Sequence, residues 1–403
     1  MTGAGGETFT ARIVASVGEI GAAAWDAIAA AEGALADGRP GDPFVSYAFL
    51  AALEGSGCAS AATGWHPRHV VLEDAAGAIV GLAPGWFKTH SRGEYVFDQG
   101  WAEAWTRAGG RYYPKLQVAV PFTPVPGPRL MAAAGTAERR AAIKRGLIAA
   151  LEAVTVEAGL SSAHVTFPDP GDADLMARAG WAIRHDRQFR FVNRGYRDWD
   201  DFAATLLGRK RKQLVRERRE ANAEVTIRFL RGAEIGEAQW DAFFAFYMDT
   251  GSRKWGRPYL DRTFFSTIGA TMGDRLLLVL AEAEGRAIAG ALNFVGAEAL
   301  YGRWWGALEE RPFLHFELCY HRAVDWAIAH GLGRVEAGAQ GEHKLARGYE
   351  PVLTRSAHFV VDPGFRAAVD RFLSEERAAV AALIAEERAA SPFAGRAEAA
   401  ATS

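Results

Sequence analysis

A chain of 403 residues is long enough for about two domains, and its 49% hydrophobic and 23% charged residues are ordinary for a globular protein. The formal net charge of −2 argues against a protein that coats nucleic acid, and the two cysteines, Cys58 and Cys319, are too few for a disulfide framework. Its start lacks a basic segment followed by an apolar run, and no apolar stretch reaches about 18 residues. We therefore expect a cytoplasmic protein without a secretory signal or a spanning helix.

The chain contains one hairpin pattern twice. Residues 70–88, "VVLEDAAGAIVGLAPGWFK", and residues 276–296, "LLLVLAEAEGRAIAGALNFVG", both read as strand, glycine turn and strand, each after an aromatic amphipathic segment. Such hairpins are common enough to coincide by chance, but a repeat at about half the chain length favours two copies of one α/β unit. We predict a first domain over 1–195, a second over 196–390 and a disordered tail over 391–403.

After the first hairpin, "GEYVFD" predicts a strand that leads into a helix. Alternation along this strand would place Glu94 and Asp98 on one face, where two carboxylates suit an amine ligand or form an ordinary polar face. The following "YYPKLQVAVPFTPVPGPRL" is too apolar for a linker, and we interpret it as an insertion that covers a cleft with Lys115 pointing inward. The first half is then expected to contain helix 136–159, strand 161–168, helix 172–180 and strand 181–195.

The second half opens with a basic run, "GRKRKQLVRERRE", inside a helix expected over 199–221. On a helix Arg209, Lys212, Arg216 and Arg219 share one face. This face is predicted to contact the phosphates of tRNA, of lipid headgroups at a peripheral membrane contact or of coenzyme A, although a solvated helix face is the commoner meaning of such runs. Further elements are expected at 225–230 (strand), 237–250 and 261–271 (helices), 299–306 (strand), 316–331 (helix), 334–339 and 355–361 (strands) and 363–389 (helix).

The strand at 299–306 leads through a loop into a helix and a second strand. Such a loop presents backbone N–H groups at a helix start, which suits an anion or a carbonyl. Gly302 and Gly306 flank "RWW" and indicate either close approach of a ligand to the strand or room for the tryptophans to pack. Tyr301, Trp304 and other nearby aromatic residues predict a pocket for an apolar acyl chain or a lipid amine.

The segment "EAGAQGEHKLARGYEP", residues 336–351, gathers ionisable groups just where a strand should end. Loops at the carboxyl ends of parallel strands tend to be functional, although a solvated turn with a surface ion pair is the plain alternative. The sequence therefore predicts that this segment carries the chemistry.

Several of these stretches together resemble one family. "HSRGEYVFD", "YYPKLQVAVPFTPVPGPRL", "RKRKQLVRERR", "LYGRWWG", "LHFELCY" and "EAGAQGEHKLARGYEP" are similar to the Fem-like family labelled "peptidoglycan biosynthesis/recognition", within the GNAT acyltransferase superfamily. The similarity runs from about Pro43 to Phe372. It implies an α/β (α+β) chain of two tandem GNAT-like domains, each a mixed central sheet flanked by helices, and transfer of an activated acyl group to an amine.

The donor of that acyl group stays open. GNAT enzymes carry an R/Q-x-x-G-x-G/A loop for the pyrophosphate of coenzyme A, and "GALEERPFLHF" from Gly306 to Phe316 lacks this glycine pattern. Fem enzymes also lack the loop and use aminoacyl-tRNA. Acyl-CoA, an acyl carrier protein and aminoacyl-tRNA are therefore all compatible with the sequence.

Acyl transfer to an amine needs a base, a group that stabilises the oxyanion, and exclusion of water. The candidates for the base are His343, Glu342 and Glu317. His343 has the most suitable unperturbed pKa, and Glu317 is equally consistent with a charge at a helix N-terminus. Among the other polar residues, Lys344, Arg303 and Arg347 are expected to hold an oxyanion or a phosphate, Gln340 to orient a carbonyl, and His315 to act as a ligand group or a loop residue.

We therefore expect an N-acyltransferase that moves an acyl group from an acyl-CoA type thioester to a small-molecule or lipid amine. One alternative is a Fem-like transferase that uses aminoacyl-tRNA and acts on a peptide or cell-wall precursor. Another is a non-catalytic module that recognises muropeptides or lipid. No metal is expected, since the two histidines of "HPRH" at 66–69 have no further ligands nearby in the sequence.

Overall fold

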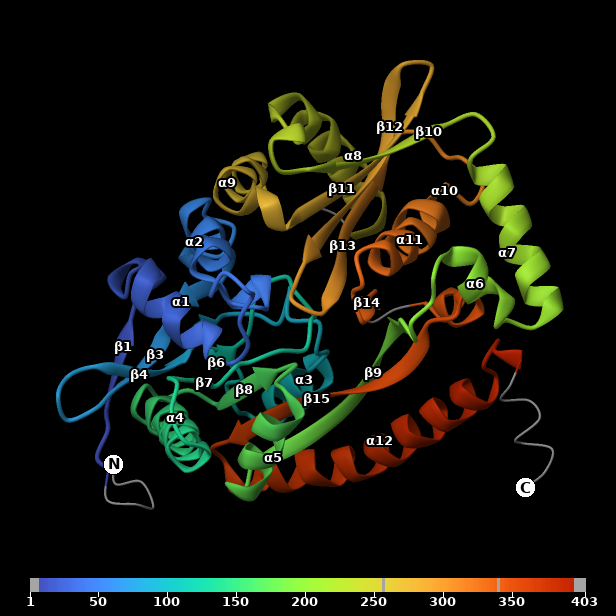
Figure 1. Ribbon diagram of the computed structural model, residues 1–403. Helices are drawn as coiled ribbons and strands as arrows, with labels where there is room; N and C mark the ends of the chain where they lie inside the picture. The colour runs from blue at the N-terminus through green and yellow to red at the C-terminus, as the bar shows by residue number, and fades with distance from the viewer. Residues whose placement is uncertain (1–6, 256–257, 339–340, 395–403) are drawn as a thin grey trace. The chain divides into compact units, whose positions relative to one another are not determined.

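The computed structural model describes residues 7–255, 258–338 and 341–394 (Figure 1). Contacts within the chain define two compact units: unit 1 comprises Met1–Asp186 and Thr354–Val380, and unit 2 comprises Arg187–Leu353 and Ala381–Ser403. The chain thus returns to unit 1 after it has formed most of unit 2. The domain limits predicted at residues 195 and 390 stay a prediction.

Unit 1 holds two groups of strands with helices packed on them. Its elements are β1 (Thr10–Val14), α1 (Ala22–Ala30), α2 (Tyr47–Gly55), β2 (Trp65–Pro67), β3 (His69–Glu73), β4 (Ile79–Ala83), β5 (Gly85–Lys88), α3 (Gln99–Arg107), β6 (Lys115–Val118), β7 (Met131–Ala132), α4 (Ala137–Glu157), β8 (Ser162–Thr166) and α5 (Pro170–Arg178). The strands β1-β3-β4-β7 form an antiparallel sheet. The other group has the order β15-β8-β6-β5-β2, in which β15 is Glu350–Val360 and β6 and β8 run parallel.

Helix α4 shows how the sequence builds unit 1. The Thr136 side chain accepts a hydrogen bond from the backbone N–H of Arg139 at 3.3 Å and caps the helix start. Gly159, with φ of +63°, follows the helix end. The buried face of α4 places Ile143, Leu147 and neighbouring apolar residues in one core cluster with the strands. The helix predicted over 136–159 is confirmed.

Unit 2 is one mixed sheet with helices on both faces. Its elements are α6 (Trp199–Ala204), α7 (Gly208–Ala221), β10 (Thr226–Arg231), α8 (Glu237–Trp255), α9 (Arg262–Met272), β11 (Leu276–Ala283), β12 (Arg286–Val295), β13 (Ala299–Ala307), α10 (Leu314–Phe316), the π-helical turn η6 (Glu317–His321), α11 (Arg322–Ala329), β14 (Arg334–Glu336) and the 3₁₀ turn η7 (Glu342–Arg347). Three longer elements, β9 (Ala182–Val192), β15 (Glu350–Val360) and α12 (Pro363–Ala389), begin in one unit and end in the other.

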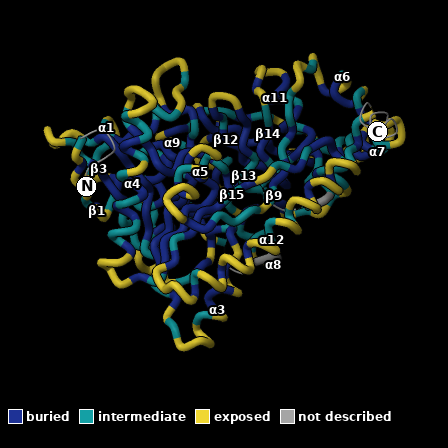
Figure 2. The backbone as a smooth tube through the Cα atoms, turned by 90° about the horizontal axis from the view of Figure 1, so that it is seen from below, coloured by how far each residue is buried: buried dark blue, intermediate teal, exposed yellow. Residues whose placement is uncertain are grey.

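The strand order in unit 2 is β10-β11-β12-β13-β14-β9, with β13 and β14 parallel and every other pair antiparallel. Successive side chains along each strand point to opposite faces of the sheet, so a sheet covered on both faces buries both sets. Leu277 and Val279 lie in one core cluster with Leu318 and Ala323 of the helical segment 314–329, whereas Leu278 faces the α8 side beside Phe243. In Figure 2 the central strands, such as β11 and β12, are mostly dark blue, and the helices carry exposed outer faces.

Most predicted elements are present, including both hairpins and the long helix 363–389, so the predicted class of mixed sheets flanked by helices is confirmed. Three local predictions are wrong. "GEYVFD" is a loop rather than a strand, because Gly93 and Tyr95 have φ of +82° and +60°. The apolar segment after it contributes the buried strand β6 to the unit 1 sheet and is not a covering insertion. The helix predicted over 199–221 is broken between α6 and α7.

Candidate active site

Strands β13 and β14 separate shortly after they pair. Their parallel pairing runs only from Ala299↔Arg334 to Tyr301↔Glu336, although β13 continues to Ala307. A register shift in β12 opposite this point leaves Arg303 as the extra residue of β13, between Gly302 and Trp304. Within the described part of the chain, β13 has no strand partner on the β14 side beyond Tyr301, and this is where the sheet opens.

A cavity of about 120 Å³ lies at this opening. It is lined by Ala291, Leu292, Asn293, Gly302, Arg303, Trp304, Trp305, His315, Cys319, Tyr320 and Ala337. The lining therefore comes from β12, β13, the helical segment 314–329 and the residue after β14. An engineered cavity of about 150 Å³ holds a benzene molecule, so this one accommodates a reacting group rather than a whole cofactor.

Tyr320 lines this cavity, and a hydrogen bond connects it to His343, which lies behind Tyr320 and outside the described lining. Tyr320 belongs to η6, a π-helical turn inside the helical segment 314–329, and such turns occur often at functional sites. Its hydroxyl lies 2.9 Å from Nε2 of His343 in η7. Burial raises the pKa of Tyr320 above its ordinary value, so the hydroxyl keeps its proton. The result is a tyrosine–histidine pair that can pass a proton.

The basic residues of η7 hold the chain rather than line the cavity. Lys344 is buried, and its Nζ donates to the carbonyl oxygens of Ala337 and Gly338 at 2.6 and 3.0 Å. Burial lowers the pKa of Lys344 to about 8. Arg347 donates to Glu217 of α7 at 2.5 Å and to the His343 carbonyl at 2.8 Å. These bonds fix the backbone on both sides of His343.

Glu317 is engaged in a buried ion-pair network. Arg218 contacts its two carboxylate oxygens at 3.1 and 3.2 Å, and Arg322 lies 2.8 Å from one of them. Arg218 also bonds Asp325. With its carboxylate bound by two guanidinium groups, Glu317 fixes η6 and is poorly placed to accept a substrate proton.

The other predicted unit 2 residues divide into three groups. Arg303, Trp304 and His315 line the cavity, and the His315 ring lies 5.1 Å from that of Trp305. Tyr301 is buried in the last β13–β14 pair. Gln340 and the side chain of Glu342 lie outside the described residues. Arg209, Lys212 and Arg216 lie on the outer face of α7.

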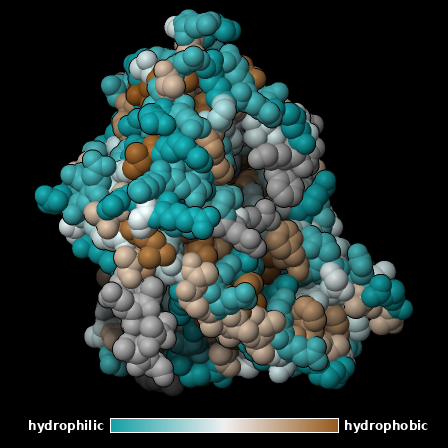
Figure 3. Space-filling model, turned by 90° about the vertical axis from the view of Figure 1, so that its right-hand side faces the viewer, coloured by the Kyte–Doolittle hydropathy of each residue, from teal (hydrophilic) through white to brown (hydrophobic). Residues whose placement is uncertain are grey.

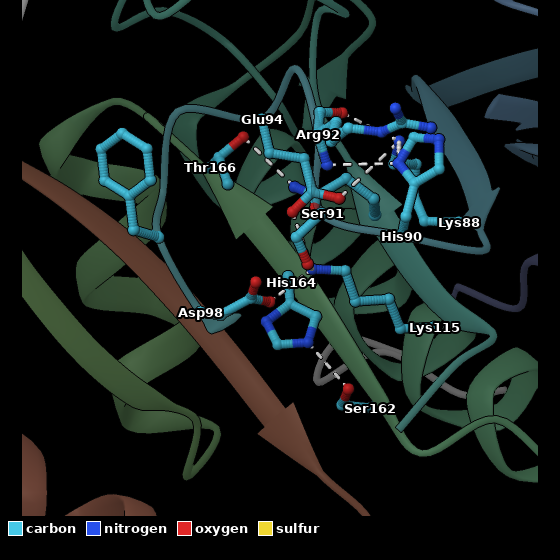
Figure 4. A network of polar contacts seen from close by, with 12 residues as sticks. Lys88, His90, Ser91, Arg92, Glu94, Asp98, Lys115, Ser162, His164 and Thr166 are labelled. Carbon is cyan, nitrogen blue, oxygen red and sulfur yellow. Dashed lines mark hydrogen bonds and ion pairs between the residues drawn. The ribbon is translucent and has the colours of Figure 1, made fainter. Parts of the chain in front are cut away.

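The predicted unit 1 residues form a separate buried network (Figure 4). Nζ of Lys115 donates to Glu94 at 2.7 Å, to Ser91 at 2.9 Å and to Asp98, and these three charged side chains are almost completely buried. The two carboxylates hold the amine of Lys115 in this structure, rather than the amine ligand that their pattern suggested. A second lysine, Lys88, lies 3.9 Å from Glu94 and 3.5 Å from the centre of the Trp65 ring.

Burial and mutual charge set the pKa values in this network. Burial lowers the pKa of Lys88 to about 7 and raises that of Glu94 to about 7. Burial opposes the charged forms of Asp98 and Lys115 as well, but their ion pair holds the pKa of Asp98 below and that of Lys115 above its ordinary value. Two lysines and two carboxylates thus share one dry site.

Two histidines extend the network across the strands. His164 and His358 lie directly opposite each other on β8 and β15, with Nδ1 atoms 2.6 Å apart. Burial lowers the pKa of His164 to about 3 and that of His358 well below its ordinary value, so both rings are neutral, and one donates to the other. Sequence reasoning missed Lys88, His164 and His358. The triplet Ser-Ala-His at 162–164 and again at 356–358 was the available signal.

The chain matches the family described as peptidoglycan biosynthesis/recognition, FemAB-like, over residues 16–395, and it belongs to this family. Among solved structures it is similar to FemX, with a TM-score of 0.48 and 12% identity over 81% of this chain and 94% of that one. It is also similar to a tandem GNAT protein from the clavulanic acid biosynthesis pathway, with a TM-score of 0.47 and 13% identity over 88% and 99% of the two chains.

A third similar structure is L-PGS from Bacillus licheniformis, with a TM-score of 0.47 and 10% identity over 80% of this chain and 95% of that one. None of the curated proteins matches the chain. The family predicted from the motifs is confirmed.

Two further properties concern the described residues only. None of their helices combines the length and the apolar character that crossing a bilayer requires. Nor do three or more His, Cys, Asp or Glu side chains among them converge in a way that suits a metal ion.

Proposed function

We propose that this chain is a transferase that moves an activated acyl group to a primary amine in the unit 2 cavity, and that it acts in the cytoplasm. The observation that carries the proposal is the Tyr320–His343 hydrogen bond beside a cavity into which β13 and η6 project. Membership of the FemAB-like family supports it. The fixed backbone around His343 supplies the rigidity that a general base requires.

The reaction follows from the positions of these groups. The amine nitrogen forms a bond to the acyl carbon, and the bond from that carbon to the donor's sulfur or oxygen breaks. His343 accepts the amine proton, directly or through the Tyr320 hydroxyl, and the proton then passes to the leaving sulfur or oxygen. Arg303 on the cavity wall is positioned to stabilise the oxyanion of the tetrahedral intermediate.

The donor proposed first is an acyl thioester of the acyl-CoA type, with a lipid or other amphiphilic amine as the acceptor. The volume of about 120 Å³ suits the reacting end of the acyl group, and Trp304 and Trp305 give it apolar walls. No step depends on how the rest of the donor is held.

One observation favours a second donor, the aminoacyl ester of tRNA, with a peptide or cell-wall precursor as acceptor. The loop before α10 carries Glu309 and Glu310, and its one basic residue, Arg311, is paired with Glu309 and Glu224. Carboxylates at a helix start oppose a pyrophosphate there. This loop therefore offers no site for the pyrophosphate of coenzyme A, and a coenzyme A donor would have to place its phosphates elsewhere on the chain.

The two donors are separated by one experiment. The purified chain is incubated with a primary amine and either acyl-CoA thioesters of increasing length or aminoacylated tRNA, and amide products are detected by mass spectrometry. We expect an amide with one donor and its loss in His343→Ala. No amide with either donor, together with retained binding of muropeptide or lipid, would overturn the proposal and indicate a recognition module.

A further inference from the structure

Helix α7 has two faces with different roles. On its inner face, Glu217 binds Arg347 of η7, and Arg218 binds Glu317 of η6. The helix is thereby anchored to η6, which lines the cavity, and to η7, whose His343 bonds the cavity residue Tyr320. Its outer face carries the exposed basic residues Arg209, Arg211, Lys212, Arg216 and Arg219.

The outer face is basic but not uniformly polar. Val215 is 49% exposed, and Leu207, directly before the helix, is 39% exposed. On the helix surface the neighbours of Val215 are Arg211 four residues before it, Lys212 three before it and Arg219 four after it. A branched apolar side chain thus stands in water within a ring of cations. Figure 3 shows the side of the molecule on which α7 lies in Figure 1 as largely hydrophilic, with isolated hydrophobic patches.

We propose that the outer face of α7 is a docking surface for the anionic surface of a lipid bilayer. Clustered Lys and Arg on a helix attract anionic headgroups, and an apolar residue among them can enter the boundary between headgroups and acyl chains. The surface is distinct from the proposed reaction site, but α7 connects the two through Glu217 and Arg218. Docking here would hold the unit 2 cavity close to amphiphilic amines.

The composition of this face favours a bilayer over RNA. Proteins that bind single-stranded RNA stack its bases on aromatic side chains, whereas helix α7, Gly208–Ala221, contains none. The exposed Val215 has no role in binding phosphates but a direct one in a bilayer interface. Binding of RNA to this face is therefore the alternative outcome that the test must distinguish from binding of a bilayer.

The test measures co-sedimentation of the full chain with vesicles at low salt. The vesicles are phosphatidylcholine mixed with phosphatidylglycerol, and phosphatidylcholine alone. We expect binding to the mixed vesicles only, weakened by about 25-fold in Lys212→Gln/Arg219→Gln, since each basic residue near the surface contributes about fivefold. The matched control is Arg107→Gln/Arg178→Gln, which neutralises two exposed arginines on unit 1 helices and should bind like the wild type.

A second pair of variants isolates the apolar contribution and does not alter charge. Val215→Ser should weaken binding to mixed vesicles, whereas Val156→Ser, at a 56% exposed valine on α4, should not. All variants are first compared with the wild type by circular dichroism and urea unfolding. Absence of wild-type binding to the mixed vesicles overturns the proposal, and so does equal weakening by the control variants.

Bulk tRNA provides the remaining arm. If the chain binds tRNA more tightly than mixed vesicles, and Lys212→Gln/Arg219→Gln weakens this binding while Val215→Ser does not, the partner is RNA and the bilayer proposal is wrong. A failure of the proposed acyl transfer would be distinguishable from a failure of this proposal. Acyl transfer is measured by amide formation in the wild type and in His343→Ala, and docking is measured by vesicle binding.

Discussion

The hydroxyl of Tyr320 and Nε2 of His343 lie 2.9 Å apart, and this bond connects the π-helical turn η6 to the 3₁₀ turn η7. Neither turn would bring a proton-transfer pair to the cavity alone. The extra residue of the π-helical turn changes which side chains face the sheet, and η7 is held by the carbonyl contacts of Lys344. The pair depends on both segments.

The first prediction concerns this pair. His343→Ala should lower kcat/KM for amide formation by about 100-fold or more, the usual contribution of a general base. If the amine proton reaches His343 directly, Tyr320→Phe should lower kcat/KM less than His343→Ala does. If the Tyr320 hydroxyl relays the proton, the two variants should lower kcat/KM equally. The measurement is kcat/KM from initial rates of amide formation by the wild type and both variants.

The matched control for this prediction is His330→Ala, because His330 stacks on Trp326 and bonds the Trp326 carbonyl, whereas His343 bonds the cavity residue Tyr320. Its rates should equal those of the wild type. An unchanged kcat/KM in His343→Ala would remove His343 from the mechanism.

A second prediction tests the anchoring of η7 by α7. The Arg347–Glu217 pair is buried, with side chains 5% and 4% exposed, so Glu217→Ala leaves an unpaired buried guanidinium. We expect a loss of about 3 kcal/mol in the free energy of unfolding, measured in urea. The same helix offers the control: Glu220 pairs with Arg216 at 44% and 58% exposure, and Glu220→Ala should cost less than about 0.5 kcal/mol. Equal losses in the two variants would contradict the assignment.

Sequence patterns predicted elements whose signals are local. Thr136 and Gly159 bound α4, and the apolar periodicity over 363–389 gives α12 its limits. The break between α6 and α7 was missed because its cause is distant in sequence. The N–H of Leu207 donates to the carbonyl of Pro392, and the N–H of Ala394 donates to that of Thr205. The helix propensities of residues 199–221 cannot predict these two backbone hydrogen bonds to residues near the end of the chain.

The site could be predicted only in part, because it too depends on contacts between residues that are distant in sequence. Trp304 and His315, which "LYGRWWG" and "LHFELCY" offered as substrate-binding candidates, line the cavity, and their role there stays a prediction. A sequence cannot show whether a charged side chain serves a ligand or its own fold, and Lys344 and Glu317 are bound internally. Tyr320 was within a recognised motif, but nothing in the sequence pairs it with His343.

A third prediction separates the two glycines that flank "RWW". A Cβ on Gly306 would lie 2.2 Å from the backbone of Phe246 in α8, so Gly306→Ala must push a helix away and should cost about 1–3 kcal/mol. A Cβ on Gly302 would meet nothing closer than 3.5 Å, but Gly302 lines the cavity. Gly302→Ala should leave stability within about 0.5 kcal/mol and lower kcat/KM instead. Urea unfolding and initial rates on both variants check this, and a destabilised Gly302→Ala with normal rates would contradict it.

The last prediction concerns pH and the buried network of unit 1. Burial lowers the pKa of Lys88 from 10.5 to about 7, so between these values the unfolded chain binds more protons and stability rises with pH. Burial raises the pKa of Glu94 from 4.5 to about 7, so between these values the folded chain binds more protons and stability falls as pH rises. The two effects meet near neutral pH, where this pair contributes least to stability.

Lys88→Met removes the first of these effects and keeps an apolar stem against Trp65. Between about pH 7 and about pH 9 we expect the wild-type free energy of unfolding to rise by about 1 kcal/mol per pH unit, and this rise to vanish in Lys88→Met. Lys212→Met, at an exposed lysine of α7, should retain it. Urea unfolding at each pH gives the three curves. Parallel curves for the wild type and Lys88→Met would assign the rise to other groups, and Lys88 would then be charged at neutral pH, held by Glu94 as a buried ion pair.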